Sequence, residues 1–278
     1  MRTILALLLS AACLMAGPRG SYDSLTAGYL TKVYQGSGVG IAPYEAGRIS
    51  NLILAVYSGA TWSNVRIYNQ NFGQNAGTGS VVYTSGGWSP DNHNLIGSPT
   101  WGAGGINYNG TTQYGADPSD IWAGGTALSV FVDFAQDTLT LAQALVSSFG
   151  AVDQRSFLFQ TPALGADYNF ITNLNGNTTP SSQVSTFGTP ATATQRSIFA
   201  VYSASSLVAY INGSSSTVTT NPTASLFNGT IPFCIGAQNQ VVAASTFFDG
   251  KIACVIIIKQ TLSTAAALRI NAAMEALR

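Results

Sequence analysis

The sequence predicts a mainly β protein, an antiparallel two-sheet β-sandwich with a small helical N-terminal segment and a short C-terminal helix. Two observations in the last third of the chain favour this fold class. Short apolar runs end at turn-forming pairs such as Asn212-Gly213 and Asp249-Gly250, which tolerate the backbone conformations of tight turns. These runs follow one another at the spacing of antiparallel strands, which differs from the longer spacing of a βαβ fold.

The composition limits what the chain can be. Its 278 residues are 46% hydrophobic, which is enough for one large β-domain and a smaller N-terminal piece. Only 8% of the residues are charged and the formal net charge is +0, whereas about 25% of residues are charged in a typical globular protein. Nucleic-acid binding needs clustered cations, so the composition argues against it. Low charge with many Ser, Thr, Asn and Gly residues is associated with secreted, cell-surface and virion proteins.

The N-terminal segment has two interpretations. Arg2 followed by the apolar run Ile4–Ala16 resembles a signal peptide, and Ser10-Ala11-Ala12-Cys13 resembles a lipoprotein cleavage site. The alternative, which we favour, is a retained apolar helix that docks against this or another subunit. The run is too short for a membrane span, which takes about 20 apolar residues.

Residues 1–100 are predicted to form an attachment or assembly region with a helical start, short strands and loops. Asp23 or Ser24 can cap a helix that carries Leu25, Tyr29, Leu30 and Val33 at helical spacing. Ile49–Tyr57 is apolar enough to be either a strand or a buried helical turn. The remaining expectations are an alternating strand at Trp62–Tyr68, a short strand at Val81-Val82-Tyr83 and a loop at Ser85–Gly105.

Residues 101–278 are predicted to form the sandwich, with the boundary near Gly102-Ala103-Gly104-Gly105. Loops are expected at Asp117–Trp122 and Ser181–Thr194, and a helix capped by Ser263 is expected at Ser263–Leu277. The expected strands are Leu128–Phe134, Leu139–Phe149, Arg155–Gln160, Tyr168–Leu174, one from Ser197 to a turn near Ala204-Ser205-Ser206, Leu207–Ile211, Ile231–Gly236 and Lys251–Lys259.

Four motifs in order carry a resemblance to a known family. The hairpin Tyr202–Gly213 (Y-S-A-S-S-L-V-A-Y-I-N-G), the run F-C-I-G-A and the run F-F-D-G-K-I-A-C-V-I-I resemble the last third of a laminin-G-like, concanavalin A-like lectin domain. Gly105–Tyr114 is similar to that family's opening strand and turn, so the resemblance covers roughly Gly105 to Arg278. It implies a jelly-roll sandwich of the kind found in bacteriophage virion and bacterial surface proteins. Asp23–Arg66 loosely resembles segments that precede such domains.

The three cysteines are Cys13, Cys234 and Cys254, so at least one is unpaired in a monomer. Cys234 and Cys254 lie in apolar strand runs and could pair only if those strands are neighbours. Two buried thiols are the favoured interpretation.

The sequence argues against an enzyme. The resemblance implies that a glycoside hydrolase of this shape would carry two closely spaced carboxylates, E-x-D-x-x-E, on one strand. The only two glutamates, Glu45 and Glu275, lie at opposite ends of the chain. His93 is the only histidine, which disfavours an ordinary zinc site, and no G-x-S-x-G elbow is present. No cofactor is expected, although Asp117 and Asp120 form a weak candidate calcium site.

Glycan binding demands less, namely an exposed aromatic ring for stacking and amide or carboxylate side chains for hydroxyl groups. The candidate ligand-binding residues are Trp88, Asn92, His93, Trp101, Asp117, Trp122 and Asn239. Each of them also has a structural interpretation, such as a rim position that closes the sandwich.

The favoured hypothesis is a non-catalytic virion structural or adhesion protein, such as a phage decoration, fibre or tail component. Its partners would be other virion proteins or a second copy, through residues 1–100, together with a cell-surface polysaccharide. It would bind no nucleic acid and have no membrane span. The alternative is a secreted or lipid-anchored bacterial carbohydrate-binding module at the cell surface, and a glycoside hydrolase comes third.

Overall fold

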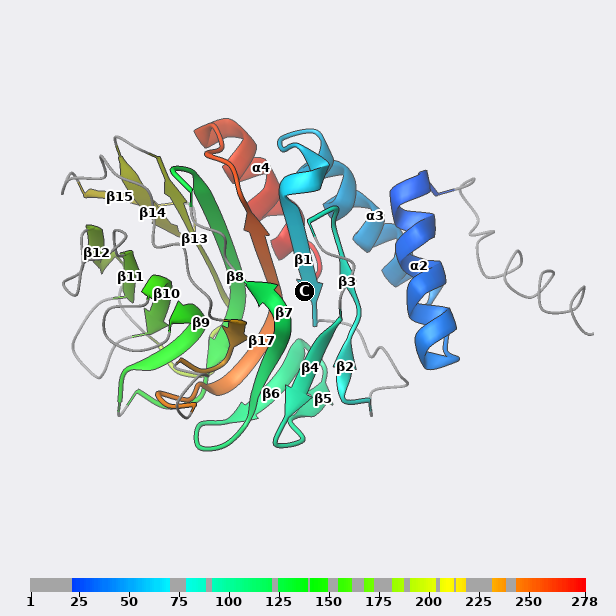
Figure 1. Ribbon diagram of the computed structural model, residues 1–278, viewed down its shortest axis with the longest axis horizontal. Helices are drawn as coiled ribbons and strands as arrows, with labels where there is room; N and C mark the ends of the chain where they lie inside the picture. The colour runs from blue at the N-terminus through cyan, green and yellow to red at the C-terminus, as the bar shows by residue number, and fades with distance from the viewer. Residues whose placement is uncertain are drawn as a thin grey trace, which may run out of the picture.

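A computed structural model describes residues 22–70, 79–88, 92–121, 125–139, 141–149, 155–161, 168–172, 182–187, 191–203, 206–212, 214–218, 232–238 and 244–278. Two antiparallel sheets pack face to face, and helices lie against the outer side of one of them (Figure 1). The predicted mainly β, two-sheet sandwich is therefore confirmed. The expectations for Ile4–Ala16 and Cys13 lie outside the described residues.

The first sheet, here named sheet A, has nine strands. Seven of them follow the order β15-β14-β13-β8-β17-β1-β3, and β6 joins β17 and β5. The strands are β1 (Val65–Asn69), β3 (Thr84–Ser85), β5 (Thr100–Gly102), β6 (Gly105–Asn109), β8 (Leu128–Gln136), β13 (Arg196–Tyr202), β14 (Leu207–Ile211), β15 (Ser214–Val218) and β17 (Asp249–Ile258).

The second sheet, sheet B, has eight strands in the order β12-β11-β10-β9-β16-β7-β4-β2. They are β2 (Val81–Val82), β4 (His93–Ile96), β7 (Tyr114–Ile121), β9 (Gln143–Phe149), β10 (Arg155–Thr161), β11 (Tyr168–Thr172), β12 (Ser182–Phe187) and β16 (Pro232–Ile235). The described helices are α2 (Ser24–Ser37), α3 (Pro43–Tyr57), α4 (Thr264–Glu275) and the short 3₁₀ helix η1 (Trp62–Asn64).

The segments that differ from expectation are short or ambiguous in sequence. Ile49–Tyr57, for which the sequence left a strand and a buried helical turn open, belongs to the helix α3. The expected loop Ser85–Gly105 contains the strands β4 and β5. The backbone of residues 117–121, expected as a loop, continues β7, and β12 lies inside the expected loop Ser181–Thr194. Neighbouring strands supply hydrogen-bond partners that local sequence patterns do not reveal.

The sandwich also begins earlier in the chain than expected. β1 lies inside sheet A between β17 and β3, and Ile67 is paired with Ile256. β2 and β4 form the edge of sheet B. The expected boundary near Gly102–Gly105 therefore does not separate an attachment region from the sandwich, because strands on both sides of it share the same two sheets.

Two apolar cores hold together three layers, which are sheet B, sheet A and the helices. Residues such as Val132, Phe170 and Ile235 fill the space between the sheets. The opposite face of sheet A, with Phe131 and Ile256, packs against α2, α3 and α4. Sheet A is covered on both faces, and alternate residues of a strand point to opposite faces. Both sets of side chains in β8 and β17 are therefore buried, and the sequences of these strands are nearly continuous apolar runs.

The first described helix, Ser24–Ser37, is capped by Asp23, which is one of the two caps that the sequence left open. The Asp23 carboxylate accepts hydrogen bonds from the backbone N–H groups of Leu25 and Thr26, both at 3.0 Å, and from the Ser50 hydroxyl of α3 at 3.1 Å. Burial by itself would raise the pKa of Asp23, but a hydrogen bond from the Thr26 hydroxyl at 2.6 Å, together with those above, lowers it. Ser263 likewise caps α4, as predicted, by accepting from the Ala266 N–H.

Replacing Asp23 with alanine is expected to lower the free energy of unfolding by about 1–2 kcal/mol, because a helix cap and a link between α2 and α3 are both lost. Urea denaturation measures this change. Asp23→Asn retains one oxygen acceptor and is expected to lose less than half as much. Equal losses in the two variants would show that the cap contributes little.

Both described cysteines are free and buried, as favoured from the sequence. Cys234 lies in β16 of sheet B and Cys254 in β17 of sheet A, so their strands are not neighbours. Burial raises the pKa of Cys234 to about 12, which keeps this thiol protonated at neutral pH.

Among the described helices, none has the length and apolar character that crossing a membrane requires.

Candidate functional site

The two outer sheet faces differ in what covers them. α2, α3 and α4 cover the outer face of sheet A, whereas no described helix packs on the outer face of sheet B. The outer face of sheet B is exposed in part: Asn94 and Ile96 are exposed, whereas Ala116 and Cys234, paired on the same face, are buried. We name part of that outer face the β4–β7 face, defined by Asn94 and Ile96 of β4, Tyr114 of β7, and Phe247. This surface is the candidate functional site.

Strand alternation places these side chains. Along β4, His93 and Leu95 are buried between the sheets, whereas Asn94 and Ile96 are exposed. Ile96 is paired with Tyr114 and Asn94 with Ala116, so Tyr114 shares the outer face with the exposed β4 residues.

Phe247 completes the face from a distant part of the chain. Its ring lies 6.1 Å from that of Tyr114, centroid to centroid, and both side chains are partly exposed. Phe247 follows a bridge between Gln238 and Ser245, and the Gln238 amide donates to the Thr246 hydroxyl at 2.5 Å. Partial burial, followed by the nearby Cys234, raises the pKa of Tyr114, so its hydroxyl remains neutral.

The candidates from the sequence are distributed over several places. Asn92 directly precedes β4, and its Oδ1 atom is buried without a hydrogen-bond partner among the described residues. The backbone of Asp117 lies in β7, paired with Phe233, but its side chain and that of Asp120 lie outside the described set. Trp122 and Asn239 also lie outside the described residues.

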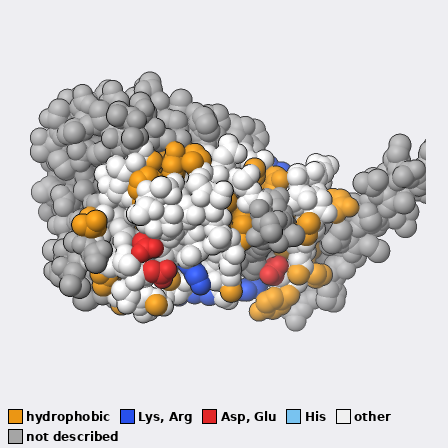
Figure 2. All heavy atoms as spheres, turned by 90° about the horizontal axis from the view of Figure 1, so that it is seen from below, with side chains coloured by type: hydrophobic (Ala, Val, Ile, Leu, Met, Phe, Trp, Pro, Cys, Tyr) orange, Lys and Arg blue, Asp and Glu red, His pale blue; other side chains and the backbone are white. Residues whose placement is uncertain are grey.

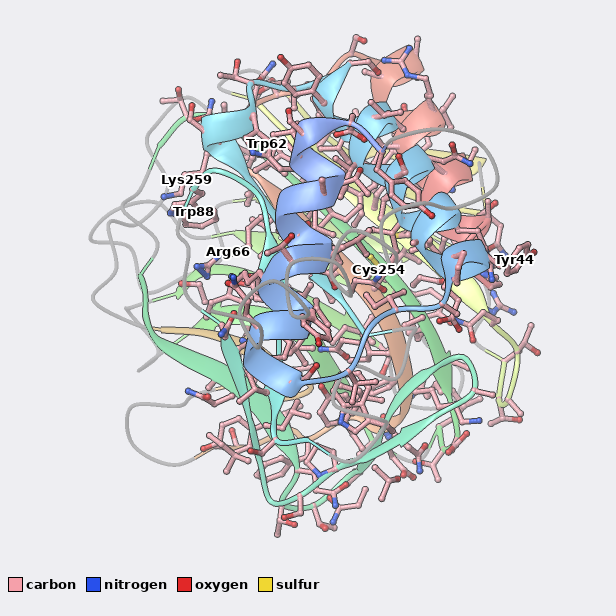
Figure 3. The ribbon with its side chains drawn as sticks, turned by 90° about the vertical axis from the view of Figure 1, so that its right-hand side faces the viewer. Tyr44, Trp62, Arg66, Trp88, Cys254 and Lys259 are labelled. Carbon is pink, nitrogen blue, oxygen red and sulfur yellow. The ribbon has the colours of Figure 1, made fainter. Side chains whose placement is uncertain are left out.

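Two of the candidate tryptophans, Trp88 and Trp101, lie in the described part of the chain, and the side chain of each contacts another residue. The Lys259 ammonium lies 3.4 Å from the centroid of the Trp88 ring, and Figure 3 shows both side chains at one edge of the molecule. The backbone N–H of Trp88 donates to the backbone oxygen of Val65, which is the first residue of β1. Trp101 donates through Nε1 to the Gly79 oxygen at 2.7 Å, as a rim residue that closes the sandwich would.

His93 lies in the interior of the sandwich and not in a loop as expected. Its ring packs edge-on against Tyr68 of β1 at 5.0 Å, and no part of its surface is exposed. Burial, and then the charge of Arg66, lower the pKa of His93 to about 3. The backbone of Gly115 opposes this shift only in part. His93 is therefore a neutral core residue at pH 7.

Gly115 makes room for this histidine. A Cβ atom at Gly115 would lie 2.1 Å from the His93 Nε2 atom. We expect Gly115→Ala to lower the free energy of unfolding by about 2 kcal/mol through overpacking, as measured by chemical denaturation. In a His93→Ala background the added methyl group has space, so the same change is expected to cost under about 1 kcal/mol. An undiminished cost in that background would contradict the steric explanation.

The comparisons with known proteins identify the family. The model of the "Concanavalin A-like lectin/glucanases superfamily" matches residues 109–266, which is more than half of the chain. This chain belongs to that superfamily. The match confirms the resemblance found in the sequence, and it covers β7 through β17 and the start of α4. No curated protein sequence matches the chain.

Several solved structures are similar to this chain at low sequence identity. A Trypanosoma rangeli sialidase in complex with sialic acid aligns with a TM-score of 0.55 and 11% identity, over 78% of this chain and 34% of the sialidase. This chain thus spans about a third of that enzyme's length. Domain 4 of AbnA, a GH43 extracellular arabinanase from Geobacillus stearothermophilus in complex with arabinotriose, aligns at 0.46 and 18% identity over 74% and 87% of the two chains. A Ruminococcus gnavus IT-sialidase CBM40 bound to α2,3-sialyllactose aligns at 0.44 and 10% identity over 52% and 82%.

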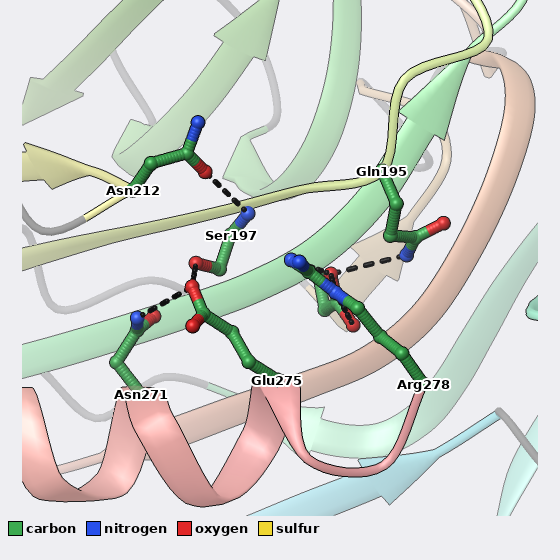
Figure 4. Close-up of polar contacts among 7 residues, drawn as sticks. Gln195, Ser197, Asn212, Asn271, Glu275 and Arg278 are labelled. Carbon is green, nitrogen blue, oxygen red and sulfur yellow. Dashed lines mark hydrogen bonds and ion pairs between the residues drawn. The ribbon is translucent and has the colours of Figure 1, made fainter.

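Because the superfamily includes glucanases, its carboxylates require inspection. Asp133 of β8 has no exposed surface and forms an ion pair with Arg278 at 2.8 Å, and Gln195 donates to it at 3.0 Å (Figure 4). Glu275 of α4 accepts from the Ser197 hydroxyl and from the Asn271 amide (Figure 4). Burial raises the pKa of Asp133, and its polar partners oppose that shift. Both carboxylates lie between sheet A and α4, on the opposite side of sheet A from sheet B.

Within the described part of the chain, no group of three His, Cys, Asp or Glu residues is arranged to hold a metal ion. The calcium expectation at Asp117 and Asp120 concerns side chains outside the described set.

Tyr114 and Phe247 were not among the site residues predicted from the sequence. The signal for Phe247 was the pair Phe247-Phe248, because adjacent strand residues point to opposite faces. The structure buries Phe248 completely between the sheets and leaves Phe247 partly exposed.

Proposed function

We propose that this protein is a non-catalytic glycan-binding protein whose binding surface is the β4–β7 face. The observation that carries the proposal is the partly exposed aromatic pair Tyr114 and Phe247, 6.1 Å apart, on the same sheet face as the exposed Asn94 amide. Aromatic rings can stack on the C–H face of a sugar, and amides can bond its hydroxyl groups. Membership of a superfamily that contains lectins supports the proposal.

The absence of catalysis is part of the proposal. Hydrolysis of a glycosidic bond requires two carboxylates that flank the substrate. Asp133 and Glu275 are instead engaged by protein groups beneath α4, an arrangement that favours a structural role for both. If the protein hydrolysed a polysaccharide and substitution of one carboxylate abolished that activity, the proposal that the protein is non-catalytic would be overturned.

A glycan array tests the binding proposal with the full chain. Wild-type protein is expected to bind at least one glycan, and Tyr114→Ala or Phe247→Ala is expected to weaken binding about tenfold, the loss of about 1.4 kcal/mol that one aromatic contact can supply. Tyr44→Ala is the matched control, because Tyr44 is 76% exposed on α3, in the helical layer (Figure 3). Absence of binding to every glycan would refute the function, and equal losses in all variants would refute the site.

We further propose that the protein is a virion component, such as a decoration, fibre or tail protein, attached through its N-terminal helical region. The low charge and the apolar run Ile4–Ala16 support this assignment. Mass spectrometry of purified particles is expected to find the chain, and its absence would overturn the assignment. A mature protein that lacks residues 1–12 and carries lipid on Cys13 would favour the alternative, a lipid-anchored bacterial binding module.

A further inference from the structure

The basic residues of this chain are distributed unevenly between the layers. Of 11 Lys and Arg residues, only Arg155 and Arg196 lie between Arg66 and Lys251 in the sequence. Arg196 belongs to β13 of sheet A, so Arg155 of β10 is the single basic residue in the strands of sheet B. The helices and the strands of sheet A carry Lys32, Arg48, Arg66, Arg196, Lys251 and Arg269, and Lys259 follows β17. The Arg66 side chain acts on His93 of β4 but has no exposed surface, and Lys259 lies against Trp88.

Arg155 is remote from the β4–β7 face. The strand order places β9 and β16 between β10 and β7, which separates β10 from β7 by about 14 Å at the usual strand spacing. That distance exceeds the screening length of about 8 Å at physiological salt. His93 of β4 points into the sandwich and is neutral at pH 7.

The sequence adds no cation from neighbouring segments. Residues 122–124, 219–231 and 239–243, which adjoin β7 and β16 in the chain, contain no charged residue. The only charged residues in the sequences of β7 and β16 are acidic, Asp117 and Asp120. Figure 2, seen from below the view of Figure 1, shows few charged side chains among many uncharged ones on the described surface.

From this distribution we infer that the β4–β7 face selects uncharged sugars and rejects acidic ones, an inference that rests on the proposed glycan-binding function. Recognition of a sugar carboxylate or sulfate uses Arg or Lys donors, which the face does not possess. Its described groups are two aromatic rings, one aliphatic side chain and an amide, which suit the C–H faces and hydroxyl groups of neutral sugars.

Paired oligosaccharides test the inference. Each pair shares one neutral backbone, with and without a terminal sialic or uronic acid, and titration calorimetry with the full chain is run at about 20 mM and about 300 mM NaCl. The neutral member is expected to bind, with an affinity that changes less than about twofold between the two salt concentrations. Tyr114→Ala is expected to weaken this binding about tenfold, and Tyr44→Ala to leave it unchanged.

A second variant, which is expected to gain affinity, keeps the inference testable if Tyr114→Ala fails to fold. Asn94 is exposed, so Asn94→Lys places a cation on the face without disturbing the core. It is expected to increase affinity for the acidic member about fivefold at low salt, the effect of one exposed ion pair of about 1 kcal/mol. Preference of the wild-type protein for the acidic member, or loss of its binding at high salt, would overturn the inference while leaving glycan binding intact. No binding of any glycan would instead refute the proposed function, and the inference with it.

Discussion

Arg278→Leu is expected to lower the free energy of unfolding by about 3 kcal/mol at pH 7. The substitution removes the guanidinium that lies 2.8 Å from Asp133, a carboxylate with no exposed surface, and leaves that charge with the Gln195 amide as its other polar contact. Breaking a buried ion pair from one side usually costs about 3–5 kcal/mol, and the 33% exposure of Arg278 places the expectation at the low end.

The loss of stability in Arg278→Leu is also expected to depend on pH. Burial already raises the pKa of Asp133, and removing Arg278 raises it further, so the carboxyl of the variant takes up a proton more readily. Protonation removes the unpaired charge, and the destabilisation is therefore expected to shrink between pH 7 and pH 5. Guanidinium denaturation at both pH values measures it.

Arg269→Leu is the matched control for this experiment. Arg269 is an exposed arginine of α4, the helix that ends at Glu275 shortly before Arg278, and its loss is expected to change stability by less than about 0.5 kcal/mol. If the two arginine variants lost equal stability, the buried ion pair could not be the cause.

The second large effect is a loss of stability in mild acid through His93. The pKa of this buried side chain is about 3 in the fold, against 6.5 in the unfolded chain. The folded protein therefore binds fewer protons than the unfolded one between these values, so stability falls as pH drops below 6.5 and the whole contribution is lost below pH 3. From pH 7 to pH 4.5 the expected loss is about 2.5 kcal/mol.

His93 is the only histidine, so its replacement removes histidine titration from both the folded and unfolded states. His93→Leu is expected to lose about 2.5 kcal/mol less than wild type between pH 7 and pH 4.5 in urea denaturation. Asp23 and Asp133 titrate in both proteins and cancel in this comparison. An unchanged pH profile in the variant would show that His93 does not remain neutral in the fold.

Several predictions from the sequence were wrong where the strands are too short to show a recognisable pattern of alternation. β4 and β5 have four and three residues, and the segment that contains them is rich in residues that usually form turns. They become strands because β7 and β6 lie beside them and pair with their backbones. The position of His93 followed from the same pairing, which a single sequence does not display.

The sequence by itself determined the features that depend on near neighbours in the chain. These are the strand runs with their turns, the caps at Asp23 and Ser263, the buried thiols and the scarcity of cations between Arg66 and Lys251. Periodicity and capping act over a few residues, so they can be read directly.

Only the tertiary structure decided which sheet face the helices cover, and which side chains from distant segments meet. Tyr114 meets Phe247 because β7 and the segment before β17 converge on one face, and Arg278 reaches Asp133 across 145 residues of sequence. Such contacts arise from packing of whole layers, whose free energy depends on complementary surfaces and leaves no local pattern in the chain.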